Sequence, residues 1–258
     1  RIRSYSSCPL KSFVLFLLRI VLIYIDGGET CVICGNRSSY LPLCSKCRKL
    51  RFDINKIIDV PRCSVCGREL ISTKELCFPC KSDNVKRHSD FCYALFSYRL
   101  WNKELMFMWK QQGVRTLSFF FACLVSDFFK KKDIEYVIPV PPRPGKINEK
   151  GWDQIEELCK NLEFIFGFKI LRILKRNSSD QQKKLDRESR LKTIGKAYSL
   201  KSKSEIAKEV KKIKVRGPKK VCVLDDVSTT GATLESCSAL VKEVFDCEVV
   251  GVALFIVD

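Results

Sequence analysis

Three features on which many enzymes and membrane proteins depend are scarce or absent in this sequence. Histidine occurs once in 258 residues, as His88 in a polar stretch where we interpret it as solvated, so any mechanism must proceed without histidine. No GxxxxGK[ST] segment occurs, so the chain lacks the P-loop of nucleotide-hydrolysing proteins. The apolar run at residues 13–25 is interrupted by Arg19 and is shorter than the about 18 apolar residues that a membrane helix needs. It indicates a buried or interfacial helix, with a membrane anchor as the alternative.

The charge of the chain is strongly one-sided. Lysine and arginine number 47 against 29 aspartate and glutamate, and the resulting net charge of +18 is spread over most of the length. Such an excess favours polyanionic partners, either nucleic acid or phosphorylated ligands. The alternative is that many of these lysines only solvate helix faces. Charge alone therefore does not choose a function.

Cysteine is abundant, and its spacing is more informative than its number. Eight of the fifteen cysteines form four CxxC pairs, which fall into two sets: Cys31, Cys34, Cys44 and Cys47, then Cys63, Cys66, Cys77 and Cys80. Each set can close one tetrahedral thiolate site, because a CxxC turn aims two sulfurs at one metal and a hairpin brings the second pair opposite. We expect two structural zinc ions in sequential ribbons, in a reducing compartment.

Three alternatives to sequential zinc ribbons are open at this point. The paired cysteines could bind zinc in a cross-braced arrangement, ligate an iron–sulfur cluster, or form disulfides, which we rank lowest. Seven further cysteines lie outside the pairs. We expect three of them in the core, namely Cys222, Cys237 and Cys247. No pattern assigns a partner to the other four, which are Cys8, Cys92, Cys123 and Cys159.

Composition divides the chain into three zones. Residues 1–30 form an apolar N-terminal helix, residues 31–85 hold both cysteine sets, and residues 90–258 alternate apolar strands with amphipathic helices. A polar linker with turn-forming residues spans 81–90. The alternation is typical of an α/β domain.

Within the third zone the periodicity of apolar residues predicts individual elements. One or two helices are expected over 101–132, with a break near Gly113, and another helix over 152–166. A charged excursion occupies 175–200. The remaining expected elements are strands at 134–140, 168–171, 219–227 and 247–257, and a helix over 231–245.

The stretch VCVLDDVSTTGATLESC, residues 221–237, combines an acidic pair with a turn that suits an anion. A strand ends in Asp225 and Asp226, and backbone amides, hydroxyls and a helix N-terminus follow. Such a turn is a phosphate cradle, formed here by Ser228, Thr229, Thr230, Gly231, Ala232 and Thr233. Because carboxylates repel phosphate, they must face another group, such as vicinal ribose hydroxyls or Mg²⁺. The structural alternative is a strand followed by a threonine N-cap.

This stretch closely resembles the 5-phosphoribosyl 1-diphosphate (PRPP) signature of type I phosphoribosyltransferases. A second stretch, VIPVPPRPGKINEKGWDQ at 137–154, resembles the pyrophosphate-loop region of the ComF family of competence-related proteins. That family shows a proline-rich strand end and then Arg-Gly-aromatic-Asn-Gln. Here Lys150 replaces the arginine and Asp153 replaces the asparagine.

A third stretch extends the resemblance. QKKLDRESRLKTIGKAY, residues 182–198, is similar to the family's pattern of glutamine, leucine and arginine through Gln182, Leu185 and Arg190. Thr193 stands where the family usually has asparagine. Together with the two cysteine sets, the resemblance covers nearly the whole chain from Cys31 onward.

The resemblance implies a fold and a set of roles. The fold would be α/β, a type I phosphoribosyltransferase-like, mostly parallel sheet flanked by helices and preceded by a small zinc-ribbon module. Asp225 and Asp226 would hold the ribose hydroxyls, and residues 229–233 the 5-phosphate. Residues 139–146 would approach the diphosphate, where Mg²⁺ and three basic side chains supply positive charge: Arg143, Lys146 and Lys150. A segment that closes over the ligand would carry Gln182, Arg187 and Arg190.

The resemblance also implies a function. We expect a cytoplasmic PRPP-binding protein linked to DNA uptake in natural transformation, which handles single-stranded DNA beside a helicase-like ATPase and a membrane DNA channel. Association with the membrane is a further expectation. The alternative is an active Mg²⁺-dependent phosphoribosyltransferase of nucleotide or base metabolism, with Asp225, Asp226, Arg143 and Lys146 as the catalytic residues.

Overall fold

The computed structural model describes most of the chain outside the N-terminal segment and a few loops. The described residues are 14, 17, 18, 20, 21, 25, 29–38, 41–58, 60–70, 75–82, 87–177, 197–213 and 217–257. The helix expected over 1–30 therefore lies mostly outside them, as do Cys8, Gln182, Leu185, Arg187, Arg190 and Thr193. Within the described residues, no helix is both long enough and apolar enough to cross a membrane.

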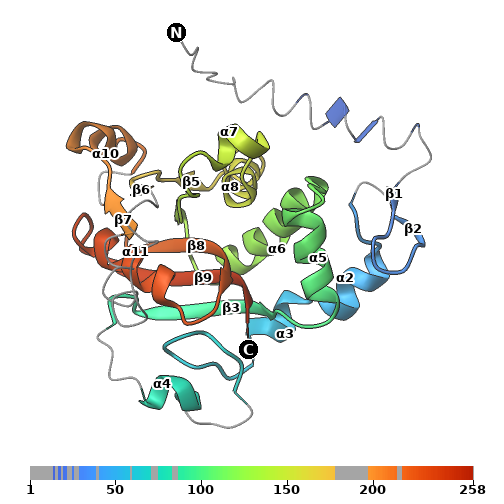
Figure 1. Ribbon diagram of the computed structural model, residues 1–258, viewed down its shortest axis with the longest axis horizontal. Coiled ribbons are helices and arrows are strands. Elements are labelled where there is room, and N and C mark those ends of the chain that lie inside the picture. Colours follow the sequence, from blue (N-terminus) through green and yellow to red (C-terminus); the bar gives the residue numbers. More distant parts are fainter. Residues whose placement is uncertain are drawn as a thin grey trace.

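A five-stranded parallel sheet forms the centre of the molecule (Figure 1). Its order is β3-β9-β8-β4-β5, where the strands are Phe91–Ser97, Glu248–Ile256, Lys220–Ser228, Tyr136–Pro139 and Lys169–Ile170. Strand β9 after Glu248 and residues 221–224 of β8 are continuously apolar and buried, as strands of a parallel sheet with both faces covered should be. The α/β fold with a parallel sheet flanked by helices is confirmed.

Two hydrophobic cores lie on the two faces of this sheet. Successive side chains of β8 point alternately into the two cores: Cys222 and Leu224 belong to the first, and Val221 and Val223 belong to the second. The first core is covered by α5, α6 and α8, which span Trp101–Lys110, Thr116–Lys131 and Gln154–Phe164. The second is covered by α11, Ala232–Lys242, and by the antiparallel hairpin of β6, Leu174–Arg176, and β7, Tyr198–Leu200. A short helix, α7, spans Lys146–Lys150, and α10 spans Lys203–Val210.

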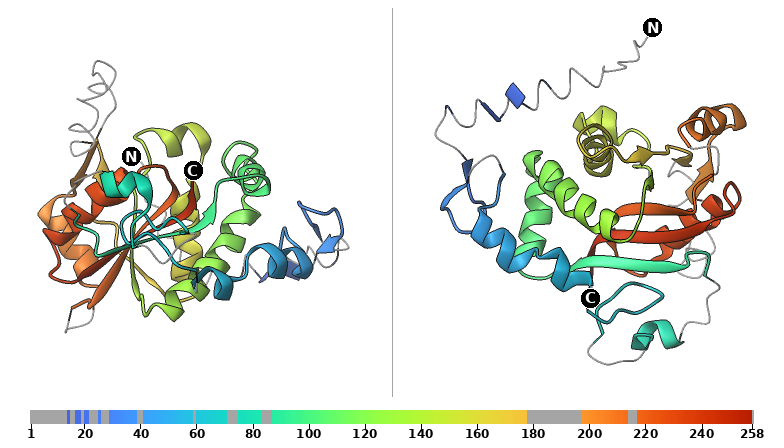
Figure 2. Two further views of the ribbon diagram at one scale, coloured as in Figure 1. Left: turned by 90° about the horizontal axis from the view of Figure 1, so that it is seen from below. Right: turned by 180° about the vertical axis from the view of Figure 1, so that it is seen from behind.

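The first cysteine module stands beside α5 and α6 (Figures 1 and 2). It consists of the two-residue strands β1, Glu29–Thr30, and β2, Arg37–Ser38, followed by helices α2, Ser45–Arg51, and α3, Ile54–Ile58. Phe52, between the two helices, packs edge-on against Phe96 of β3 and Phe120 of α6. The module thus shares the first core of the sheet.

The second cysteine module includes the short helix α4, Phe78–Ser82, and lies against strand β3 (Figure 1). Three of its cysteines are buried in a small cluster with Ala94 of β3 and Ile256 of β9. After this module, residues 87–90 contact α11: Glu235 accepts hydrogen bonds from Ser89 Oγ at 2.7 Å and faces His88 Nδ1 at 3.0 Å. His88 is therefore half-exposed and bound to a carboxylate, outside both cysteine clusters.

Most expected elements are found close to their predicted bounds. The break near Gly113 separates α5 from α6, and the strands at 134–140, 168–171, 219–227 and 247–257 correspond to β4, β5, β8 and β9. The structure adds elements that the pattern did not predict individually, namely β3, α7, α10 and the β6–β7 hairpin at the ends of the charged excursion. Of the cysteines expected in the core, Cys222 and Cys237 are fully buried, whereas Cys247 is partly buried.

Candidate functional site

The acidic pair lies at the carboxyl end of the central strand β8, where ligands bind in open parallel sheets. Asp225 and Asp226 are the sixth and seventh residues of this strand, and the tight turn 229–231 then leads into α11. Gly231 adopts a φ of +79°, and no atom lies within 4 Å of the place where a Cβ would stand. The turn therefore has both the left-handed backbone that favours glycine and open space in front of it.

The hydroxyl groups of the turn are available to a ligand to different degrees. Thr229 and Thr230 are exposed, and Thr230 Oγ1 accepts a 3.4 Å hydrogen bond from the amide of Ala232. Thr233 is partly buried, within hydrogen-bonding reach of Tyr198 from β7. Ser228 is 5% exposed, and its Oγ finds no hydrogen-bond partner among the described residues. This turn is thus rich in donors, as a phosphate cradle requires.

The two neighbouring carboxylates have different environments. The pKa of Asp225 is raised from 3.8 to about 7, because the group is buried from solvent and because the charge of Asp226 repels a second charge beside it. The amide of Asp226 donates a 2.8 Å hydrogen bond to Asp225 Oδ1, and the charge of Lys110 also favours the ionised form, but neither offsets the burial. Near neutral pH, Asp225 is therefore partly protonated.

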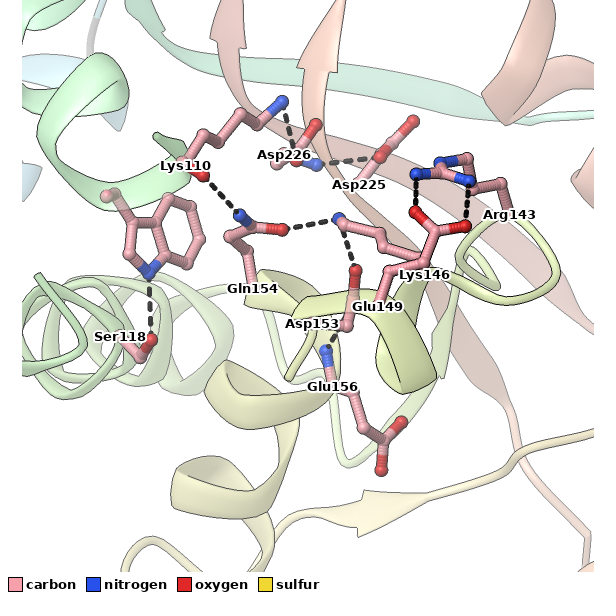
Figure 3. A network of polar contacts seen from close by, with 11 residues as sticks. Lys110, Ser118, Arg143, Lys146, Glu149, Asp153, Gln154, Glu156, Asp225 and Asp226 are labelled. Carbon is pink, nitrogen blue, oxygen red and sulfur yellow. Dashed lines mark hydrogen bonds and ion pairs between the residues drawn. The ribbon is translucent and has the colours of Figure 1, made fainter. Parts of the chain in front are cut away.

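Asp226 instead has a cationic partner from another element. Its Oδ2 lies 2.7 Å from Nζ of Lys110, the last residue of α5, on the first face of the sheet (Figure 3). The side chain of Lys110 is 31% exposed and that of Asp226 is 16% exposed. No sequence pattern distinguishes Lys110, because a lysine in the last turn of a helix is the usual complement to the helix dipole.

A chain of polar contacts joins Lys110 to the loop after β4 (Figure 3). Gln154 donates a 3.4 Å hydrogen bond to the Lys110 carbonyl and accepts one from Nζ of Lys146. Lys146 also forms a 2.6 Å ion pair with Asp153, which caps α8 by accepting a hydrogen bond from the amide of Glu156. Asp153 and Gln154 are the last two residues of the stretch 137–154, and both are buried.

The proline-rich loop 139–146 runs beside the acidic pair. The amide of Val140 bonds to the carbonyl of Leu224, so the loop leaves the sheet next to Asp225. Arg143 is exposed and paired with Glu149, and Lys150 is exposed at the end of α7. A cleft of about 320 Å³ separates this loop from strand β6. The basic residues that line the cleft are Arg172, Lys175, Arg176 and Lys201.

Each set of four cysteines converges on one point. In both sets the sulfur atoms lie within 4.8 Å of one another, and the grouping is sequential, as predicted, rather than cross-braced. Although burial would raise it, hydrogen bonds from backbone amides lower the pKa of Cys31 to about 6, whereas burial and neighbouring thiols raise that of Cys47 to about 12. A divalent cation would favour the thiolate of all four ligands. The donor sets fit two closed zinc sites.

The structure brings the predicted ligand-binding residues to one end of the sheet. The acid pair, the turn 228–233 and the loop carrying Arg143 and Lys146 all meet at the carboxyl ends of β8 and β4. The three residues predicted on the closing segment, Gln182, Arg187 and Arg190, lie outside the described residues. Lys110 and Tyr198 also reach the site and were not predicted from the sequence.

Comparison with known proteins identifies a relative over most of the chain. The chain matches no family model. It is 26% identical over 226 residues to the competence protein ComFC of Streptococcus pneumoniae. The alignment covers 83% of this chain and 93% of that protein.

Proposed function

We propose that the chain is a ComF-family protein that binds PRPP at the carboxyl end of β8 and acts in the uptake of DNA, because it is 26% identical over most of its length to a competence protein. The observation that carries this proposal is the order of groups along residues 225–233. Two carboxylates precede a donor-rich turn with open space at Gly231. Hydroxyls and a phosphate need opposite kinds of partner, and a phosphorylated sugar offers both.

The surroundings of the acid pair support a second anionic group on the ligand. Lys146 reaches the site from the loop after β4, and Arg143 lies on the same loop. The cleft between this loop and β6 is lined by four basic and two acidic side chains, so its lining carries a net positive charge. Positive charge on that side would stabilise the diphosphate of PRPP, and Mg²⁺ bound with the substrate would share this task.

Transfer of the ribosyl group is a second, separable step. In this step the bond between C1 of the ribose and the diphosphate oxygen breaks, diphosphate leaves with the bonding electrons, and a nitrogen of an acceptor base forms the new bond to C1 and releases its proton to solvent. The basic residues of the loop would stabilise the leaving diphosphate. The net charge of +18 supports an additional role in contact with single-stranded DNA, in partnership with an ATPase and a membrane channel, since the chain has no P-loop of its own.

Calorimetric titration with PRPP and Mg²⁺ tests the binding proposal. The protein should bind PRPP, and the Asp225→Asn/Asp226→Asn double variant should lose most of that affinity, because neutral amides accept weaker hydrogen bonds from the ribose hydroxyls than carboxylates do. The matched control is Asp246→Asn, a change in the loop between α11 and β9. Equal PRPP affinity in all three proteins would refute the proposal.

Detection of diphosphate then separates binding from catalysis. Diphosphate released from PRPP only with one base of a panel, and only when both carboxylates are present, would establish a transferase. PRPP binding without release, together with binding of single-stranded DNA that weakens steeply with salt, would identify a ligand-binding protein that handles DNA.

A further inference from the structure

The carboxylate that the proposed ligand needs already has a cation bound to it. Lys110 Nζ lies 2.7 Å from Asp226 Oδ2, and it comes from α5 rather than from the segment 221–237 (Figure 3). This is the short distance of a charge-assisted hydrogen bond. A ribose hydroxyl that donates to the same oxygen must replace the ammonium group or share the oxygen with it.

The cation on the other side of the site is held in the same way. Lys146 Nζ lies 2.6 Å from Asp153 Oδ2 and also donates to Gln154. Gln154 in turn bonds to the carbonyl of Lys110, so the two lysines are joined through one amide side chain. Without a ligand, the groups suited to a sugar and to a diphosphate thus neutralise partners within the protein.

We propose that Lys110 is a displaceable internal cation that competes with ligands for Asp226 and so determines which ligands the site accepts. This inference rests on the proposed function. A ligand with only a ribose end must separate Asp226 from Lys110 and leaves the ammonium without a partner. A ligand that also carries a diphosphate offers a new anion to the released ammonium. Lys110 therefore favours PRPP over ribose 5-phosphate.

The size of the effect follows from the position of the ion pair. Both side chains are partly exposed, and such pairs change an equilibrium by a factor of about 3 to 5. Removal of the lysine charge should strengthen, by about this factor, the binding of any competitor for Asp226 that offers no anion to the released ammonium group. The variant Lys110→Met keeps the length of the side chain, and Lys110→Arg keeps the charge. Lys103→Met, an exposed position on the same helix, serves as the control.

The first measurement needs no sugar ligand. Mn²⁺ alone, followed by its electron paramagnetic resonance signal at pH 8, reports how much negative charge the acid pair offers. We expect Lys110→Met to bind Mn²⁺ about 3- to 5-fold more tightly than the wild type, and Lys110→Arg and Lys103→Met to match the wild type. The gain should vanish when Asp226→Asn is combined with Lys110→Met. Unchanged, weaker or undetectable Mn²⁺ binding in Lys110→Met would overturn the proposal.

The second measurement compares two sugar ligands by calorimetry in the presence of Mg²⁺. Lys110→Met should bind ribose 5-phosphate about 3- to 5-fold more tightly and PRPP no more tightly, so that the preference for PRPP falls by that factor. A variant that weakens both ligands equally would show that Lys110 only contacts or positions them, and would refute displacement. If Mn²⁺ binding tightens while no protein binds PRPP, the internal cation stands and the proposed function fails.

Discussion

The two cysteine modules share one sequence pattern and are joined to the sheet in opposite ways. Each begins with CxxCG, and in each the glycine has a positive φ, of +69° at Gly35 and +73° at Gly67. A Cβ at Gly35 would meet nothing within 4 Å. A Cβ at Gly67 would lie 2.5 Å from the amide nitrogen of Ala94 and 2.7 Å from the carbonyl oxygen of Cys92, both in β3.

The difference extends to the way each module is held. The first module packs through the side chains of α2 and α3. A groove of about 640 Å³ lies between this module and α6, and Cys123 and Asp127 of α6 line it. The second packs backbone against backbone, and Arg62 fixes it by donating to the carbonyls of Gly67, Ala94 and Ile57. The same metal-binding pattern therefore builds one module that joins the first core through side chains and one that contacts the backbone of β3.

Removal of one metal-binding cysteine should have clearly different effects on stability in the two modules. Cys63→Ser should lower the free energy of unfolding of the whole sheet domain by more than about 3 kcal/mol, because metal binding supplies the folding energy of a module that contacts β3 and β9. Cys31→Ser should unfold the first module and destabilise the sheet domain less, because that module joins the first core through side chains and, within the described residues, makes no backbone contact with β3. Far-ultraviolet circular dichroism and zinc content measure both outcomes. Equal loss of sheet structure in the two variants would contradict the comparison.

The paired glycines give a more selective test. Gly67→Ala should cost about 3 kcal/mol, since the new methyl group meets the backbone of β3 and alanine is strained at this φ. Gly35→Ala carries the strain alone and should cost about 1 kcal/mol. Urea denaturation followed by tryptophan fluorescence measures both values. A cost at Gly35 as large as that at Gly67 would show that strain, not contact with the sheet, limits both sites.

The guanidinium of Arg62 tests the contacts around that interface. Arg62→Lys should cost about 2 kcal/mol, because one ammonium group cannot reach all three carbonyls that the planar guanidinium bonds. Arg51→Lys in the first module, where the side chain lies over the ring of Trp101, is the matched control and should cost less than half as much. Thermal unfolding at constant zinc concentration checks both variants, and similar losses would contradict the proposed asymmetry.

The stability of the sheet should depend on pH through the carboxyl group of Asp225. In the folded chain the pKa of Asp225 is about 7, above its usual 3.8, so the folded state holds a proton that the unfolded state has lost. Stability is therefore lost as pH rises from about 4 to about 7 and stays low above that range. Asp225→Asn should remove this loss and so raise the free energy of unfolding at pH 8, and should have no such effect near pH 4.

The temperature at which each module releases zinc can be compared in the wild type and in Asp225→Asn. Asp225→Asn should raise the temperature of zinc release from the second site at pH 8, because that site unfolds with the sheet, and leave release from the first site unchanged. Release of both zinc ions at higher temperature would show that the two modules unfold together. No change at either site would show that ionisation of Asp225 does not lower the free energy of unfolding.

Local patterns were sufficient for much of the fold and for part of the site. The cysteine sets and the segment from Val221 to Cys237 carry their information within a few residues, and the structure groups both as expected. Helix α10 also has a local signal that could have been used. Its N-cap Ser202 and Glu205 form a capping box, visible in the sequence as Ser-Lys-Ser-Glu.

Contacts between distant segments could not be predicted in this way. Lys110 lies at the end of an amphipathic helix, and only the packing of α5 on the sheet brings it to Asp226. Arg143 lies on the loop after β4 and Lys146 is the first residue of α7. Their pairing with Glu149 and Asp153 depends on this short helix and the turn after it. Partner choice among many lysines and carboxylates is set by tertiary geometry rather than by spacing.

The attachment of the second module to β3 has a consequence for solubility. Strand β3 is one edge of the sheet, and an edge strand offers unpaired amides and carbonyls to any other extended chain. Here the amide of Ala94 donates to the carbonyl of Gly67, and its carbonyl accepts from Arg62. The opposite edge, β5, is only two residues long. The second cysteine module thus covers the longer edge of the sheet. A chain without metal would expose the unpaired amides and carbonyls of β3, with which other chains could pair and aggregate.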